Sequence, residues 1–248
     1  MISREELERV KEKRGTNLYY AEKEYLHYVF LHAIARHGGF VFKGGTCLRI
    51  CYGMERASED LDFSTRLDSG GMRTVFAECM REFEHLNIGH EKPVEKEFGG
   101  NVRFEVRFRG PLYSGDRKST NTLKIDFSRA AVKKVVPKVA PRLFSDIPVF
   151  TLNALDEGEI LAEKVRALAA RGQPRDLYDV WMLLQLGVQI DRALLKEKLA
   201  EGDNSLQSVR FPGKSEYELD LGNLLPHLPA YDHVKKDVEA ELERIGND

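Results

Sequence analysis

The stretches K-G-G-T (43–46) and D-L-D-F-S (60–64) decide the fold of this chain. The apolar run 40–43 before the glycines predicts a short strand, and residues 46–53 after them predict a short helix. Two glycines let the backbone approach a ligand closely, and a helix start offers free N–H groups. With a lysine before them and a threonine after them, they could hold a phosphate. Taken alone, the glycine pair is better interpreted as a tight turn.

Asp60 and Asp62 are separated by one residue at a second predicted strand, 61–64. Side chains at i and i+2 of a strand share a face, so both carboxylates point the same way while Leu61 and Phe63 face the core. Two adjacent carboxylates repel each other unless a cation neutralises them. Their hard oxygen atoms suit Mg²⁺, with Mn²⁺ as the alternative.

A third acid, Asp126, lies in K-I-D-F-S (124–128), which repeats the hydrophobic-Asp-Phe-Ser context of Asp62. Two such strands could deliver their acids to one end of a sheet. Three acids can bind two metals that clamp the attacking and leaving oxygens of a phosphoryl transfer. The alternative is that the acids cap strand ends or pair with Arg56 and Arg129.

The periodicity along the chain predicts strands first and helices last. Helices are expected over 3–13, from Asn17 to the Gly38-Gly39 stop, and over 71–87, 155–171, 175–187, 191–200 and 232–245. Further strands are expected over 102–110, 122–128 and 131–138. This order predicts an α+β protein, with an α/β lobe over 1–150 and a helical lobe over 151–248.

Length and composition indicate an ordinary globular protein. The chain has 248 residues, 42% of them hydrophobic, which excludes collagen-like and wholly disordered chains. No apolar run is long enough for a membrane span, and the N-terminus has no signal-peptide pattern. The three cysteines have no metal-ligand spacing, which favours reduced thiols in a cytoplasmic protein.

Taken together, K-G-G-T, R-A-S-E-D-L-D-F (56–63) and K-I-D-F resemble the DNA polymerase beta-like nucleotidyltransferase superfamily. More narrowly, they resemble the abortive-infection nucleotidyltransferase toxins of the AbiEii/AbiGii type. That family carries a later helical pair of the form L-x-x-E-K-x-x-A-L-x-x-R and R-D-x-x-D. This chain has L-A-E-K-V-R-A-L-A-A-R (161–171) and R-D-L-Y-D-V-W (175–181). The resemblance covers about 40–185.

The resemblance implies a polymerase-beta-like sheet lobe followed by a helical lobe that completes the nucleotide and acceptor cleft. It implies that Gly44, Gly45 and Thr46 cradle the triphosphate, assisted by Ser58 and by the cation of Lys43. Asp60, Asp62 and Asp126 would bind two Mg²⁺ ions, with Asp126 as the base near the acceptor hydroxyl. Lys164 and Asp176 match two further functional positions of the family.

In the predicted helical lobe, each candidate has two interpretations. Lys164 lies beside the buried face of its helix, where it could snorkel to water or meet a nucleotide phosphate. Arg175 could reach a phosphate or pair with an acid. Asp176 could orient Lys164 or favour the helix start electrostatically. Asp179, three residues further on, shares a helical face with Asp176.

The charge is unevenly distributed. The net charge is −2, but residues 101–142 hold 11 Lys and Arg against 3 Asp and Glu, while the remainder is acidic. A basic segment beside the third acid suits an RNA acceptor, and a solvated strand face explains it equally well.

The predicted function is that of a metal-dependent nucleotidyltransferase, which moves NMP from an NTP to an acceptor hydroxyl and releases pyrophosphate. By resemblance it would be the toxin of a toxin–antitoxin pair acting on tRNA, with a cognate antitoxin as partner. The alternatives are adenylylation of a small molecule such as an aminoglycoside, or of a protein hydroxyl. A non-catalytic nucleotide-binding module is the third alternative.

Overall fold

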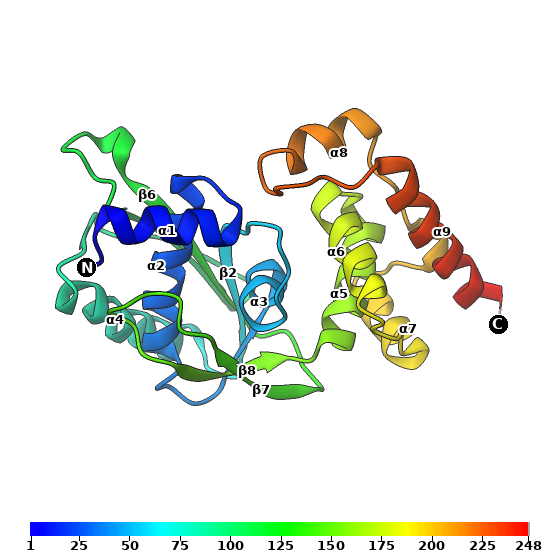
Figure 1. Cartoon of the computed structure of the whole chain (residues 1–248). Helices are drawn as coiled ribbons and strands as arrows, with labels where there is room; N and C mark the ends of the chain where they lie inside the picture. The colour runs from blue at the N-terminus through cyan, green and yellow to red at the C-terminus, as the bar shows by residue number, and fades with distance from the viewer. Residues whose placement is uncertain (248) are drawn as a thin grey trace. The chain divides into compact units, whose positions relative to one another are not determined.

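The computed structural model describes residues 1–247, drawn in Figure 1. The chain forms two compact units, Met1–Leu155 and a second that begins at Asp156. We call them the sheet unit and the helical unit. The predicted division near 150 therefore lies five residues too early, because residues 150–155 form a strand of the sheet.

The sheet unit contains a mixed sheet in the strand order β3-β5-β6-β2-β1-β8-β7, with β4 paired to β5. Its strands are β1 (Phe40–Lys43), β2 (Asp60–Thr65), β3 (Gly89–His90), β4 (Val94–Phe98), β5 (Asn101–Arg109), β6 (Asn121–Ser128), β7 (Val135–Ala140) and β8 (Phe150–Leu155). Its helices are α1 (Arg4–Arg14), α2 (Leu18–Ile34), α3 (Gly44–Cys51) and α4 (Ser69–His85), with a 3₁₀ turn at Arg117–Ser119. The central strand β2 runs parallel to β6 and antiparallel to β1.

One face of this sheet is apolar and packs against α2 and α4. The ring of Phe76 on α4 stacks on Phe104 of β5 with centroids 3.7 Å apart, and Phe30 on α2 lies against Phe63 of β2. The period-2 alternation of β5, of β6 and of the first four residues of β2 buries every second side chain. The remaining side chains, which include all three predicted acids, share the other face, which we call the polar face.

The helical unit consists of α5 (Glu157–Arg171), α6 (Pro174–Gln185), α7 (Arg192–Ala200), α8 (Lys214–Leu221) and α9 (Tyr231–Asn247), with a 3₁₀ turn at Leu206–Ser208. Its core includes the fully buried Leu161 and Val165 of α5 and Leu177 of α6. Asp156 caps α5 with its carboxylate, and Gly172 ends that helix in a left-handed conformation.

The α+β class and the order of the main elements are confirmed, but short elements were missed. No strand is predicted between residues 138 and 155, where β8 lies, although F-T-L-N-A-L alternates apolar and polar residues. The helix α8 buries only Tyr217 and Leu221, which is too weak a period to recognise. The strand expected over 131–138 begins later, at Val135, and the helix expected over 46–53 begins earlier, at Gly44.

Candidate active site

The three predicted acids lie on the two neighbouring strands β2 and β6. Asp62 is the direct register partner of Asp126, because the fragments L-D-F-S and I-D-F-S pair in parallel residue by residue. Arg103 on β5 is the register partner of Asp126 on its other side, and Lys43 on β1 is that of Asp62. These four residues form a row across the polar face, which we call the acid row.

Within the acid row, Asp126 is ion-paired. The guanidinium Nε of Arg103 donates to Asp126 Oδ1 at 2.7 Å. This hydrogen bond raises the pKa of Arg103, and the charges of Asp126, Asp60 and Asp62 raise it further. The pKa of one guanidinium is therefore raised by all three carboxylates, which means that the three predicted acids lie in one electrostatic site.

Asp60 lies two residues before Asp62 on the same face, with Lys124 as its register partner. Burial raises the pKa of the Asp60 carboxyl, and the negative charges of Glu59 and Asp126 act in the same direction. Lys124 and Lys23 act in the opposite direction. The site thus disfavours a further negative charge and would be stabilised by a cation.

The donors of the site fit a divalent cation at Asp60 and Asp62. Both present hard carboxylate oxygens from one strand face, the ligand type that Mg²⁺ prefers. Across residues 1–247, no three His, Cys, Asp or Glu side chains stand close enough to form a ready-made metal site. Asp126 would join such a site either with its carboxylate still in contact with Arg103 or after its ion pair with Arg103 breaks.

The glycine turn is packed directly against the acids. Gly44 has φ of 75°, a left-handed conformation, and a Cβ atom there would overlap the carboxylate of Asp62. A Cβ at Gly45 would lie 2.6 Å from an Arg56 guanidinium nitrogen and 3.0 Å from the Ser58 hydroxyl. The missing side chains therefore let the acids and the predicted phosphate-binding residues share one small space.

Thr46 is fully buried at the start of α3. Its hydroxyl donates to the main-chain carbonyl of Asp60 at 2.5 Å. This hydrogen bond ties the glycine turn to the strand that carries the acids. In this arrangement the side chain of Thr46 positions Asp60, and its contribution to phosphate binding would come from the backbone.

Helix α2 contributes two buried polar residues, Lys23 and His27, that no sequence motif marks. The Lys23 ammonium donates to the carbonyl of Thr122 at the start of β6. The imidazole Nε2 of His27 lies 3.0 Å from the carbonyl of Glu59, just before β2. Burial lowers the pKa of His27 to about 3, so the ring is neutral at pH 7 and donates this hydrogen bond. One turn apart on α2, the two side chains hold the starts of both acid-bearing strands.

In the helical unit, Lys164 and Asp176 are brought together as the sequence analysis anticipated. The Lys164 ammonium lies 3.1 Å from Asp176 and 2.7 Å from Asp179, two carboxylates with no exposed side-chain surface. Arg171 contacts the second oxygen of Asp176 at 2.7 Å. Two cations thus balance two buried acids, which satisfies the rule that buried charges are paired.

Arg175, predicted to contact a phosphate or an acid, does the latter. Its guanidinium pairs with Asp220 of α8 at 3.2 Å. Because α8 was not predicted, this partner could not have been named from the sequence.

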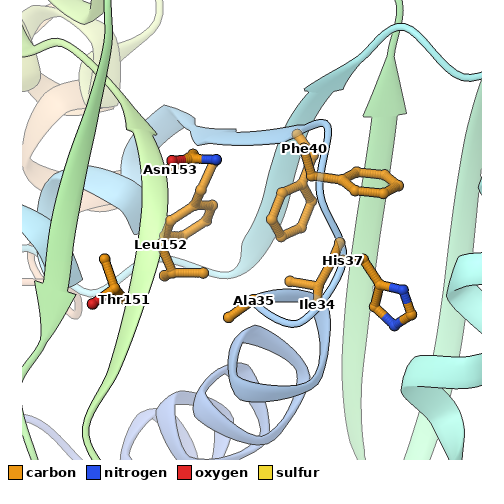
Figure 2. Close-up of a pocket in the computed structure, with 9 residues that line it drawn as sticks. Ile34, Ala35, His37, Phe40, Thr151, Leu152 and Asn153 are labelled. Carbon is orange, nitrogen blue, oxygen red and sulfur yellow. The ribbon is translucent and has the colours of Figure 1, made fainter.

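One cavity of the sheet unit lies away from the acids. Figure 2 shows residues that follow the end of α2, such as His37 and Phe40, opposite Thr151, Leu152 and Asn153 of β8. Its volume is about 180 Å³. Because Phe42 and Phe63 also line it, this cavity lies on the apolar side of β1 and β2 and is not the reaction site.

The comparisons with known proteins identify the family of this chain. Residues 31–247 match the family described as the nucleotidyl transferase AbiEii toxin of type IV toxin–antitoxin systems. The match spans most of the chain, and the chain belongs to this family. It is therefore a nucleotidyltransferase toxin, and membership implies an NTP substrate and an antitoxin partner.

Solved structures share the fold. MenT4, a nucleotidyltransferase toxin from Mycobacterium tuberculosis H37Rv, superposes with a TM-score of 0.72 and 18% identity over 99% of this chain and 93% of that chain. JHP933 from Helicobacter pylori gives a TM-score of 0.62 with 20% identity over 93% of each chain. No curated protein sequence gives a significant match.

Within residues 1–247, no helix is both long and apolar enough to cross a membrane.

Proposed function

We propose that this toxin is a divalent-metal-dependent enzyme that transfers NMP from an NTP to the terminal hydroxyl of an RNA, with tRNA as the expected acceptor. The observation that carries the proposal is the acid row beside the glycine turn. Asp62 and Asp126 are adjacent in register, and Gly44 lies in contact with the Asp62 carboxylate.

The proposed roles follow from position. The backbone of Gly44, Gly45 and Thr46 receives the triphosphate, with Lys43 and Ser58 beside it. Asp60 and Asp62 hold the divalent metal, Mg²⁺ or Mn²⁺, with Asp126 as the third ligand. When bound, the metal would neutralise charge on the phosphate oxygens of the transition state. In the helical unit, Lys164 is proposed to contact a phosphate and Asp176 to orient Lys164. Arg175 is already engaged by Asp220, so its phosphate contact would require exchange of that partner.

The transfer step can be written on these residues. The acceptor oxygen forms a bond to the α-phosphorus of the NTP, and the bond from that phosphorus to the bridging oxygen breaks. Pyrophosphate leaves with the bonding electron pair. The hydroxyl proton passes to the Oδ2 atom of Asp126, because Arg103 already donates to Oδ1. Positioning and charge neutralisation supply most of the rate enhancement in such reactions.

An RNA acceptor is favoured over an aminoglycoside or a protein hydroxyl by the basic segment 101–142. Some of its cations are already paired, since Arg103 contacts Asp126 and Arg117 contacts Glu91. Others, such as Arg107 and Lys124, lie on the polar face in or beside the rows that carry the acids. A nucleic acid is the acceptor class that such a surface attracts.

The direct test uses radiolabelled NTPs with total RNA, an aminoglycoside panel and a protein acceptor set. We expect label in RNA, dependence on Mg²⁺ or Mn²⁺, and release of pyrophosphate. The Asp62→Asn variant should fold normally and lose transfer by at least about 100-fold, because one charged metal ligand is gone. Glu105→Gln, on the same face of β5, is the matched control and should remain active. Full activity of Asp62→Asn would refute the proposal.

We also propose a cytoplasmic location, on the grounds that Cys47 and Cys79 are buried free thiols and that reduced cysteines are typical of that compartment.

A further inference from the structure

A second and larger cavity opens on the polar face, beyond the acid row. Its volume is about 750 Å³, and it is lined by Val41 of β1, Ser64 of β2 and the segment 129–133 that follows β6. Ser64 and Val41 are register partners, and Ser64 shares its strand face with Asp62. Residues i and i+2 of a strand lie roughly 7 Å apart on the same face, so the cavity begins about that far from Asp62. We call it the strand-end cavity.

The strand-end cavity is basic. Arg66, Arg129 and Lys133 line it, and no Asp or Glu among the described residues does. Arg66 and Arg129 are exposed, and neither guanidinium takes part in an ion pair with any of residues 1–247. Ser64, which also lines the cavity, adds a hydroxyl, and that hydroxyl lies 3.4 Å from the hydroxyl of Ser128. An arginine guanidinium is a planar fork of donors that can bind the two non-bridging oxygens of a phosphodiester, so such a cavity suits that anion.

The position of the cavity indicates which phosphate it would take. Because β1 is antiparallel to β2, the glycine turn after Lys43 lies on the Asp60 side of the acid row. The strand-end cavity lies on the opposite side, near Thr65, where β1 begins. The acids thus separate the triphosphate-binding turn from the cavity along the axis of β2.

Phosphoryl transfer places the attacking and leaving oxygens roughly in line on opposite sides of phosphorus. If pyrophosphate leaves toward the glycine turn, the acceptor must approach from the side of the strand-end cavity. A nucleic-acid strand that ends in the attacking hydroxyl carries its nearest phosphodiester one nucleotide back along the chain. An aminoglycoside or a protein hydroxyl carries no such group.

We propose that the strand-end cavity binds the last internal phosphodiester of a nucleic-acid acceptor strand, through Arg66 and Arg129. The inference rests on the proposed function, which supplies the direction of transfer. It assigns a binding site to the acceptor that is separate from the acids and from the glycine turn. The same site makes the enzyme select polynucleotide acceptors over small ones.

Binding can be measured without turnover. The probe is a short single-stranded RNA with a free 3′-hydroxyl and a fluorescent 5′-end, titrated by anisotropy with no NTP present. We expect the double variant Arg66→Gln/Arg129→Gln to bind about tenfold more weakly and with a shallower salt dependence. Arg81→Gln is the matched control, since Arg81 is an exposed arginine on α4, which covers the apolar face. It should bind as the wild type does.

A second probe separates the phosphate from general charge attraction. Replacing the last internal phosphate of the RNA by an uncharged methylphosphonate should weaken wild-type binding and leave the double variant nearly unchanged. Binding of a non-hydrolysable NTP with Mg²⁺ should be equal in wild type and double variant, which also checks that the variant is folded.

Equal RNA affinity in wild type and double variant would overturn the cavity assignment, as would an equal effect of the methylphosphonate on both proteins. Loss of binding to an acidic protein partner with intact RNA binding would reassign the cavity to that partner. The proposed function is tested separately, by label transfer to RNA with the wild-type protein and with Asp62→Asn. A protein that transfers label normally after both substitutions would refute the cavity assignment alone.

Discussion

At the scale of single residues, the most demanding contact is the pairing of Asp62 with Asp126. Two carboxylates in direct parallel register repel each other, and the acid row offsets this with a cation at each end, Arg103 and Lys43. The repeated D-F-S context made both acids predictable from the sequence. The guanidinium beside Asp126 was not predictable, because it depends on the antiparallel register of β5 with β6.

Arg103 competes with a divalent cation for the carboxylate of Asp126. We therefore expect Arg103→Ala to lower the Mg²⁺ concentration needed for half-maximal transfer, by a few-fold. The measurement is a Mg²⁺ titration of the initial rate at saturating NTP. Arg107→Ala is the matched control, since Arg107 lies further along the same strand face opposite Thr122. A higher Mg²⁺ requirement in Arg103→Ala would mean that the guanidinium positions Asp126 for the metal.

At the scale of secondary-structure elements, the strand–turn–helix unit β1–α3 places Gly44 directly against the carboxylate of Asp62. Gly44→Ala would combine a left-handed alanine with an overlap on Asp62. Gly53 has the same φ of 75°, but a Cβ there would meet no atom within 4 Å, so Gly53→Ala carries the backbone cost alone. We expect Gly53→Ala to lose about 1 kcal/mol of unfolding free energy and keep its activity.

Gly44→Ala should lose more stability than Gly53→Ala and lose transfer as well, because Asp62 must move. Urea unfolding and labelled-NTP assays on both variants measure the difference. Equal stability and equal activity in the two variants would show that the contact between Gly44 and Asp62 does not matter.

The contact of α2 with the acid-bearing strands predicts a pH effect on stability. His27 has an ordinary pKa of 6.5 when exposed and a pKa of about 3 in the fold. Between these values the unfolded chain binds a proton that the native protein does not, so stability falls as pH is lowered through this window. The slope contributed by His27 is about 1.4 kcal/mol per pH unit.

The measurement compares unfolding free energies of wild type and His27→Gln from neutral pH downward. The glutamine amide can still donate to the Glu59 carbonyl but does not titrate, so the difference between the two proteins should vary with pH. His85→Gln is the control, because the side chain of His85 is exposed. A pH-independent difference for His27→Gln would contradict the predicted role of the buried imidazole.

Sequence patterns recovered the elements that have strong periods or caps and missed those that depend on distant partners. The N-caps Ser3 and Asn17 and the alternation of β5 are local signals, and each element forms as expected. The strand β8 has only a short alternation of its own, and it is held by pairing with β1 on one side and β7 on the other, partners that lie elsewhere in the sequence. The hydrogen bonds of Lys23 and His27 likewise join residues that lie far apart along the chain.

At the scale of the whole molecule, the net charge of −2 conceals an arrangement of opposite charges. Acids gather on β2 and β6 and cations surround them, on the neighbouring strands and in the strand-end cavity. A near-neutral chain can therefore offer both a cation site and an anion surface on one sheet face. The average charge excludes neither a metal nor a nucleic acid, and the distribution fits both.

This arrangement predicts that Mg²⁺ stabilises the entire protein even without substrate. A ligand that binds only the native state adds about 1.4 kcal/mol when its concentration is tenfold above its Kd. For a chain of this length that corresponds to a rise in Tm of roughly 3–5 °C, which differential scanning fluorimetry in EDTA and in Mg²⁺ can measure.

The rise should disappear in Asp62→Asn, because the remaining Asp60 carboxylate no longer has a neighbouring acid on its strand to share the cation with. It should persist in Glu105→Gln, which removes a carboxylate of the same face on β5, opposite Lys124 and outside the acid row. If Mg²⁺ raises the Tm of wild type and Asp62→Asn equally, the ion acts elsewhere on the surface. The assignment of the metal to the acid row would then be wrong, whatever the effect of the same substitution on activity.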